Sequence, residues 1–267
     1  MKIFVGVIAY NEEIFIEASL RSLYEYVDKI IVVDGSYWGP SEDKTVEIAR
    51  SIGPKVEVIS GTWRWHGTDH KHIQRSQYLS MMPKGLDNWC ILHDADEVWD
   101  KENIKRLVNY LQEADERTML FSYQWIHLFN DPWHKIHGTQ WSMPRSVGTF
   151  RLVEGIRQFN HHMVGVGDVN FQKLHYPERV ILEDVMFYHY GQAASKEKMQ
   201  FKSYYYFLRD AGFRRGYKLD EWERYRKEVF EPNWKARMKQ GNVLPYDGPQ
   251  PEAIKPLIGT FWDRKKK

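Results

Sequence analysis

The stretch CILHDADEVW, residues 90–99, is an apolar run that ends on three carboxylates, Asp94, Asp96 and Glu97. Three acidic side chains at the point where a buried strand leaves the core need compensating positive charge, because unpaired buried charge is very costly. Hard divalent cations such as Mg²⁺ or Mn²⁺ bind carboxylate and phosphate oxygens. The stretch therefore indicates a metal and nucleotide site. The alternative is an acidic turn that caps the helix beginning near Asp100.

The composition is that of a globular protein with one core, or with one core and an appended lobe. The 267 residues include 38 Lys and Arg against 36 Asp and Glu, so the net charge of +2 does not favour nucleic acid as a partner. Cys90 is the only cysteine, which excludes an internal disulfide and favours a cytoplasmic location. The basic run RKKK, residues 264–267, could contact the inner face of an anionic membrane, with a solvated tail as the alternative.

The first part of the chain alternates strand-like and helical patterns, which is typical of a parallel sheet with crossover helices. The predicted strands are residues 2–9, 29–34, 55–60 and 88–93, and the predicted helices are residues 12–26, 43–52, 68–82 and 102–113. Apolar runs without alternation, such as IIVV at 30–33, indicate strands that are buried on both faces. The sequence therefore predicts an α/β nucleotide-binding sandwich of the Rossmann-like kind.

The pattern changes after about residue 117. Beyond it, the predicted strands are residues 119–126, 148–153 and 180–190, the predicted helices are 195–210 and 219–230, and prolines predict an irregular end. Aromatic residues make up 15% of the chain, and they either fill the core or stack on sugars. We predict a nucleotide-binding half at 1–117 and a helical, aromatic-rich, acceptor-binding half at 118–267, packed as one unit.

Side chains suited to nucleotide binding follow three of the predicted strands. Tyr10 and Glu12 come after the first strand, Asp34 after the second, and Asp94 and Asp96 after the fourth. Ligands of open α/β sheets bind outside the carboxyl ends of the strands, so these residues are expected at one edge. Tyr10 offers a flat face for a base, Asp34 can accept a hydrogen bond from a base or ribose, and the two later aspartates can hold a metal. Each residue taken alone could instead serve a helix cap or a turn.

Three motifs together resemble glycosyltransferase family 2, which has the GT-A fold: AYNEE at 9–13, VVDGS at 32–36 and DAD at 94–96. The DADE form and the later YHYG at 188–191 resemble its branch of bacterial envelope-sugar and peptide glycosyltransferases. The resemblance covers roughly the first hundred residues well. It implies a mixed central sheet, a nucleotide-sugar donor with UDP or GDP expected first, a Mn²⁺ or Mg²⁺ ion on the donor diphosphate, and inversion at the anomeric carbon.

The resemblance also implies which residues form the site. The donor-binding residues would be Ala9, Tyr10, Glu12, Asp34, Arg75, Asp94 and Ala95, and the metal ligands of this DXD motif would be Asp94, Asp96 and His189. Arg75 matches an arginine that precedes the metal motif in family members, and His189 matches a late histidine that binds metal in a number of GT-A enzymes. A surface arginine and a buried core histidine are the respective alternatives. The loop after Ser36 is longer and more aromatic than is usual in the family.

Three residues are candidates for the catalytic base. Inverting transfer needs a base that takes the proton of the acceptor. Asp184 is the first candidate, because the Glu-Asp pair at 183–184 resembles a pair that supplies the base in family members. Glu97 and His162 are the alternatives. Each of these two could equally have a structural role, as a helix cap or as a histidine bonded to backbone.

We expect a metal-dependent inverting glycosyltransferase of surface-polysaccharide, lipopolysaccharide or glycoprotein biosynthesis, with a glycan, lipid-linked or protein acceptor. A sugar nucleotidyltransferase on a similar sheet is one alternative, but it would need a Gly-rich phosphate loop where residues 9–12 read AYNE. A carbohydrate-binding protein without catalysis is another alternative. It leaves the carboxylates at the strand ends unexplained.

Overall fold

The computed structural model describes residues 1–36, 38–63, 71–137, 144, 147–160, 163–206, 221–239 and 243–262. Its centre is a mixed sheet in which β3, β2, β1 and β4 are parallel neighbours. These strands are β1 Lys2–Ala9, β2 Lys29–Ser36, β3 Val56–Thr62 and β4 Asn88–Asp94. Beyond β4 the sheet continues with antiparallel neighbours in the order β8, β6, β7, β13. The expected α/β fold class with a mixed central sheet is confirmed.

The second half of the chain extends the same sheet. Its strands there are β6 Leu120–Phe129, β7 Asp131–Ile136, β8 Thr149–Arg151 and β13 Val243–Pro245. The long strand β12, Arg179–Gln192, pairs in parallel with β6 and antiparallel with the short β5, Glu97–Val98. A separate small sheet consists of β9 Ile156–Asn160, β10 Met163–Val166 and β11 Val169–Asn170, and the short helix η1, Phe171–Lys173, follows it.

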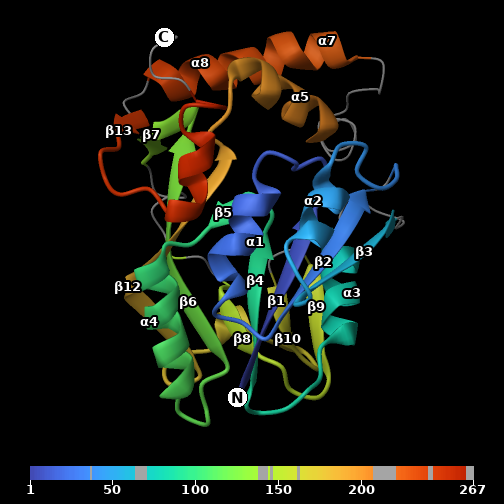
Figure 1. Ribbon diagram of the computed structural model, residues 1–267, viewed down its shortest axis with the longest axis vertical. Helices are drawn as coiled ribbons and strands as arrows, with labels where there is room; N and C mark the ends of the chain where they lie inside the picture. Colours follow the sequence, from blue (N-terminus) through green and yellow to red (C-terminus); the bar gives the residue numbers. More distant parts are fainter. Residues whose placement is uncertain are drawn as a thin grey trace.

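Helices cover both faces of the parallel strands (Figure 1). They are α1 Ile16–Tyr24, α2 Thr45–Ser51, α3 Lys71–Met81 and α4 Lys101–Gln112. Alternate residues of β1 pack into two different cores: Val5 belongs to the cluster that contains Leu20 of α1, whereas Phe4 belongs to the cluster that contains Tyr78 of α3. The apolar strand runs are therefore buried on both faces, as the sequence predicted.

A layer of helices lies across the end of the sheet where β1 and β4 finish (Figure 1). It consists of α5 Lys196–Tyr206, α7 Trp222–Tyr225, the π-helix η3 Arg226–Phe230 and α8 Glu231–Lys239, and the short helix η4, Glu252–Leu257, packs near α1. The prediction of an irregular chain after residue 230 is wrong at α8. Pro232 directly follows the π-helix η3, where the regular i→i−4 hydrogen bonds that a proline cannot donate are already interrupted.

The register of the parallel strands aligns their carboxyl ends. Ala9 of β1 is the partner of Asp34 in β2, and Ile8 is the partner of Asp94 in β4. The residues that follow these strands therefore meet at one edge, below α5. In the part of the chain described here, every helix is too short or too polar to cross a membrane.

Candidate active site

A cavity of about 480 Å³ lies between this sheet edge and the layer of helices above it. Seven of the predicted site residues line it: Ala9, Tyr10, Glu12, Asp94, Ala95, Asp96 and His189. The opposite wall comes from α5, η3 and α8 and carries residues that the sequence did not single out, among them Lys198, Lys202, Phe230, Trp234 and Arg237. The strand-end residues and the C-terminal helices thus share one cavity.

The acidic turn after β4 is held from below by a buried network. Glu97 is 1% exposed, and its Oε2 accepts a hydrogen bond from the backbone N–H of Asp94 at 3.0 Å. Nδ1 of His93 lies 3.2 Å from the same oxygen, and Nε2 of His93 lies 2.9 Å from Oγ of Ser19. Glu97 is absent from the cavity lining. The structure therefore places this candidate base beneath the turn, where it holds the backbone of Asp94.

Arg75 sets the orientation of Asp94. Its guanidinium is fully buried, and Nη2 donates to Oδ1 of Asp94 at 2.7 Å. The hydroxyl of Tyr78 is a second partner of Arg75, at 3.3 Å. Because Arg75 lies behind Asp94, it does not reach the cavity surface, and its predicted contact with the nucleotide stays a prediction. Its observed contact is an ion pair that neutralises one of the three carboxylates.

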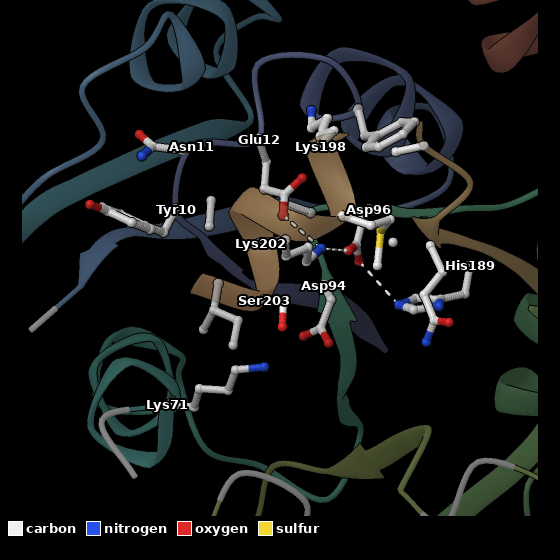
Figure 2. Close-up of a pocket in the computed structure, with 18 of the residues that line it drawn as sticks. Tyr10, Asn11, Glu12, Lys71, Asp94, Asp96, His189, Lys198, Lys202 and Ser203 are labelled. Atoms are coloured by element: carbon white, nitrogen blue, oxygen red, sulfur yellow. Dashed lines mark hydrogen bonds and ion pairs between the residues drawn. The ribbon is translucent and has the colours of Figure 1, made fainter. Parts of the chain in front are cut away.

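Asp96 is the centre of a chain of charged groups (Figure 2). Its Oδ2 accepts from Nζ of Lys202 at 2.9 Å, and the same ammonium group donates to Oε1 of Glu12 at 3.1 Å. Its Oδ1 lies 3.4 Å from Nε2 of His189. Burial of Asp96 would raise its pKa, but the charges of Lys202 and His189 hold that pKa well below its usual range. Asp96 is therefore ionised, while burial raises the pKa of Glu12.

His189 reaches Asp96 because β12 bends over the acidic turn. His189 is the strand partner of Glu97, and Tyr190 donates its backbone N–H to the carbonyl of Asp96 at 2.8 Å. The next residue, Gly191, lies so close to Asp96 that a Cβ atom there would be 2.4 Å from Oδ2. The backbone of β12 therefore lies directly against the Asp96 carboxylate.

His127 is a site residue that sequence reasoning missed. It is 2% exposed in β6, and its Nδ1 lies 2.9 Å from Nδ1 of His189. The parallel pairing of β6 with β12 places the two histidines side by side. Nothing near His127 in the sequence predicts this, because the partners are 62 residues apart. The sequence gives a weak indication of Lys198 and Lys202 as site residues, since two lysines four apart in a predicted helix share one face and could together face an anionic site.

Asp34 is at the predicted edge but faces away from the cavity. Its side chain is fully buried and accepts hydrogen bonds from the backbone N–H of Ser41 at 3.1 Å and from the hydroxyl of Ser60 at 2.6 Å. These contacts hold the long loop after β2. That loop packs on the residues after β1, where Thr45 accepts a hydrogen bond from the backbone of Glu12 at 2.8 Å. The predicted contact of Asp34 with a base or ribose stays a prediction.

Asp184, the first candidate for the base, is not brought to the cavity. Asp184 is exposed on β12, where its carboxylate accepts from the hydroxyl of Tyr110 in α4 at 3.1 Å and its carbonyl accepts from Arg106. It does not line the cavity that holds Asp94 and Asp96. His162 and the basic run at 264–267 lie outside the described residues.

Two side-chain atoms of the cavity could bind a divalent ion if a bound diphosphate supplied further oxygen ligands. Oδ1 of Asp96 and Nε2 of His189, 3.4 Å apart, are close enough to bind one ion, and carboxylate with imidazole suits Mn²⁺. Among the described residues no group of three or more His, Cys, Asp and Glu could hold a metal. Mg²⁺ and similar ions are commonly bound by one or two carboxylates together with substrate phosphates. The arrangement is therefore compatible with a metal that arrives with a diphosphate.

The fold and site define an α/β protein with an acidic, metal-compatible cavity at the carboxyl ends of its parallel strands. Residues 4–171 match the profile of "Glycosyl transferase family 2". The chain belongs to this glycosyltransferase family, and the GT-A fold expected from the resemblance agrees with the observed sheet. The match covers the acidic turn and stops before β12 and α5.

Curated relatives share part of the chain. It is 31% identical over 123 residues to an uncharacterized glycosyltransferase of Rickettsia bellii, a match that covers 46% of this chain and 37% of that protein. It is 32% identical over 98 residues to the SPbeta prophage-derived glycosyltransferase SunS of Bacillus subtilis. That match covers 37% of this chain and 21% of that protein. The matches thus span well under half the length of these relatives.

Solved structures are similar at lower identity. S. aureus TarS 1-349 has a TM-score of 0.45 and 14% identity, with 90% of this chain and 76% of that chain covered. Glucosyl-3-phosphoglycerate synthase from Mycobacterium tuberculosis, solved in complex with Mn²⁺, UDP and glucosyl-3-phosphoglycerate, has a TM-score of 0.35 and 22% identity, with 46% and 44% covered.

Proposed function

We propose that this protein transfers a sugar, with inversion, from a nucleotide-diphosphate sugar to a glycan, lipid-linked or protein acceptor, and that a divalent cation assists the reaction. Family membership supports glycosyl transfer. The observation that carries the rest is the convergence of Tyr10, Asp96 and His189 on one cavity at the ends of parallel strands. This convergence supports the proposal, because ligands of open α/β sheets bind at the carboxyl ends of the strands, where Tyr10 would stack on the base and Asp96 and His189 would hold the cation.

The residues take separate parts in donor binding. Tyr10 stacks on the base. Ala9 and Ala95 line the cavity with small side chains, which let the nucleotide approach the strand ends. Asp94, oriented by Arg75, accepts from the ribose hydroxyls. Asp96 and His189 hold the cation together with the donor phosphates. When bound, that cation stabilises the negative charge of the departing diphosphate.

The transfer itself needs a base for the acceptor. The acceptor oxygen forms a bond to the anomeric carbon as the bond from that carbon to the diphosphate oxygen breaks, and the electron pair leaves with the diphosphate. The acceptor proton passes to the base. Asp184 and Glu97 lie away from the cavity lining, so of the residues predicted for this part His162 remains the candidate. The aromatic wall of Tyr225, Phe230 and Trp234 is the part of the cavity suited to a sugar acceptor.

Metal-dependent nucleotide binding is the first test. Thermal unfolding of the native chain is measured with UDP, GDP, CDP and dTDP, each with and without Mn²⁺. A nucleotide at a hundred times its Kd stabilises the native state by about 2.7 kcal/mol, which raises Tm by several degrees. Asp96→Ala should abolish the Mn²⁺-dependent part. Asp168→Asn is the matched control, because that carboxylate is exposed and paired only at the surface with Arg157.

Two results would contradict the proposal. One is a native chain that no nucleotide stabilises, with or without the metal. The other is an Asp96→Ala variant that responds to nucleotide and Mn²⁺ as the native chain does. Sugar binding by calorimetry without any dependence on nucleotide would indicate a carbohydrate-binding protein instead.

A further inference from the structure

Helix α5 places a lysine in the middle of the acidic strand ends. Nζ of Lys202 is within hydrogen-bond distance of two carboxylates from different loops, Glu12 after β1 and Asp96 after β4. In Figure 2 the side chain points from α5 into the cavity, between these two groups. One ammonium group thus links the helical layer to the part of the sheet edge where a donor diphosphate would lie.

Of the other basic residues of the described cavity wall, Lys198 and Arg237 contact other groups, and Lys71 comes from α3 rather than from the helical layer. Lys198 lies over the rings of Phe15 and Phe261, 5.6 and 5.8 Å from their centroids. Arg237 donates to the side chain of Gln192 at 2.8 Å. Lys202 is the lysine that donates to Asp96, whereas His189, 3.4 Å from the same carboxylate, is a proposed metal ligand. Lys202 is therefore the protein cation best placed to act beside a metal at that carboxylate.

The negative charge of a donor diphosphate favours a second cation beside the metal. A nucleotide-sugar diphosphate is a dianion, and it gains a further negative charge when it leaves. A divalent ion on Asp96 has part of its charge cancelled by that carboxylate, so it alone does not neutralise the leaving group. Preorganised cations aimed at developing charge are a large source of rate enhancement, and a lysine ammonium is a common phosphate ligand.

We infer that Lys202 binds the diphosphate of the donor and, with the metal, stabilises it as it departs. In the structure the ammonium group compensates Glu12 and Asp96, and when donor is bound it turns to the phosphate oxygens. The inference rests on the proposed function and extends it to a residue outside the segment that matches the family profile.

Nucleotide affinity, measured by calorimetry, tests the inference. UDP and GDP are titrated into the full chain with Mn²⁺ and again with a chelator, and uridine and guanosine serve as ligands that lack phosphate. Lys202→Met should weaken nucleoside diphosphate binding at least about tenfold in either condition, since a hydrogen bond to a charged group is worth 1.5 kcal/mol or more. Nucleoside binding should not change. Lys202→Arg should keep most of the affinity.

Two variants complete the design. Lys196→Met is the matched control, because Lys196 is on the same helix but pairs with Glu231 at 2.8 Å and does not line the cavity. Removal of Lys202 leaves two buried carboxylates, so the pair Glu12→Gln with Lys202→Met keeps the charge balance if the single variant unfolds. It should show the same loss for diphosphates and none for nucleosides.

The outcomes separate the inference from the function on which it rests. Equal diphosphate affinity for the native chain and the Lys202→Met variants, with and without Mn²⁺, would overturn the inference. Equal losses for nucleosides and diphosphates would also overturn it, because Lys202 would then only support the fold. If the native chain binds no nucleotide at all, it is the proposed function that fails.

Discussion

Gly191 lies against Asp96, so that a Cβ atom at position 191 would be 2.4 Å from Oδ2 of Asp96 and 2.9 Å from Nε2 of His189. Real Cβ atoms do not make contacts this short, so an added methyl group must displace the carboxylate or the imidazole. Glycine at this position is therefore what allows β12 to close over the acidic turn. The two proposed metal ligands keep their positions only because residue 191 has no side chain.

Gly191→Ala should therefore remove the Mn²⁺-dependent stabilisation by nucleotide. We expect a loss of about 1–3 kcal/mol in the free energy of unfolding as well, because overpacking of a filled site has this cost. Urea unfolding and nucleotide thermal shifts measure the two effects. Gly61→Ala is the control, since a Cβ atom there lies 3.4 Å or more from its nearest described neighbour, the Trp63 ring, which is ordinary van der Waals contact. A Gly191→Ala chain that still responds to nucleotide with Mn²⁺ would contradict the assignment of Asp96 and His189.

Arg75 should contribute more to stability than any surface ion pair of the chain. Arg75→Met leaves the Asp94 carboxylate, which is 23% exposed, without its guanidinium partner. Breaking a buried pair costs several kcal/mol, and the partial exposure of Asp94 reduces this to roughly 2–3 kcal/mol. Urea unfolding measures it. Arg117→Met, at an exposed pair with Asp115, should change stability by less than about 1 kcal/mol.

A second substitution checks the cause of the Arg75 effect. Adding Asp94→Asn to Arg75→Met removes the unpaired charge, so the double variant should be more stable than Arg75→Met alone. If both variants unfold at the same urea concentration, the loss comes from packing of the arginine against Tyr78 rather than from the charge of Asp94.

The sheet edge could be predicted from sequence, because it depends on local patterns. The buried runs that end at Ala9 and His93 fix where two strands stop, and parallel strands align their ends. Tyr10, Asp94 and Asp96 therefore reach one cavity as predicted. The orientation of the Asp34 side chain could not be predicted from sequence. It depends on the path of the loop that brings Ser41 to Asp34 and on Ser60 in β3.

The positions of Glu97 and Lys202 in the structure depend on long-range packing. Sequence alone does not orient Glu97, because a carboxylate next to the metal motif can face either the cavity or the core. The pairing of β5 with β12, distant in sequence, and the buried His93 turn it into the core. Lys202 reaches the site only because α5 docks on the sheet edge, and a helical pattern does not specify where a helix docks.

His127 should orient His189 for metal binding. With the two Nδ1 atoms 2.9 Å apart, one ring donates to the other. If Nε2 of His189 binds the metal, its Nδ1 carries the proton and donates it to His127. Loss of such a partner typically lowers metal affinity by about 10–100-fold. His127→Phe should thus weaken Mn²⁺ binding in the presence of nucleotide, measured by electron paramagnetic resonance, while metal-free nucleotide binding stays.

The control for His127 is His134→Asn. His134 is half-exposed and lies 2.7 Å from Asp131, away from the cavity lining. Its removal should leave Mn²⁺ affinity unchanged. An unchanged Mn²⁺ affinity in His127→Phe would show that His189 is held by β12 alone, or that it does not bind the ion.

The contact of His189 with Asp96 should make the stability of the metal-free chain depend on pH. Burial alone would lower the pKa of His189, but Asp96 raises it overall, above the ordinary value of 6.5. A raised pKa in the folded state means that the protonated form stabilises the fold. This contribution is complete below the pKa of the unfolded chain and is lost as pH rises through the higher pKa of the folded chain.

Comparison of the native chain with His189→Asn isolates this contribution. Urea unfolding in chelator at pH 6 and pH 9 should show a larger advantage of the native chain at pH 6, since His189 is charged there and pairs with Asp96. Nuclear magnetic resonance titration of the His189 ring gives the pKa directly, and Asp96→Asn should lower it. An advantage that grows toward pH 9 would mean that neutral His189 is the form favoured by folding. The ion pair with Asp96 would then contribute nothing to the stability of the site.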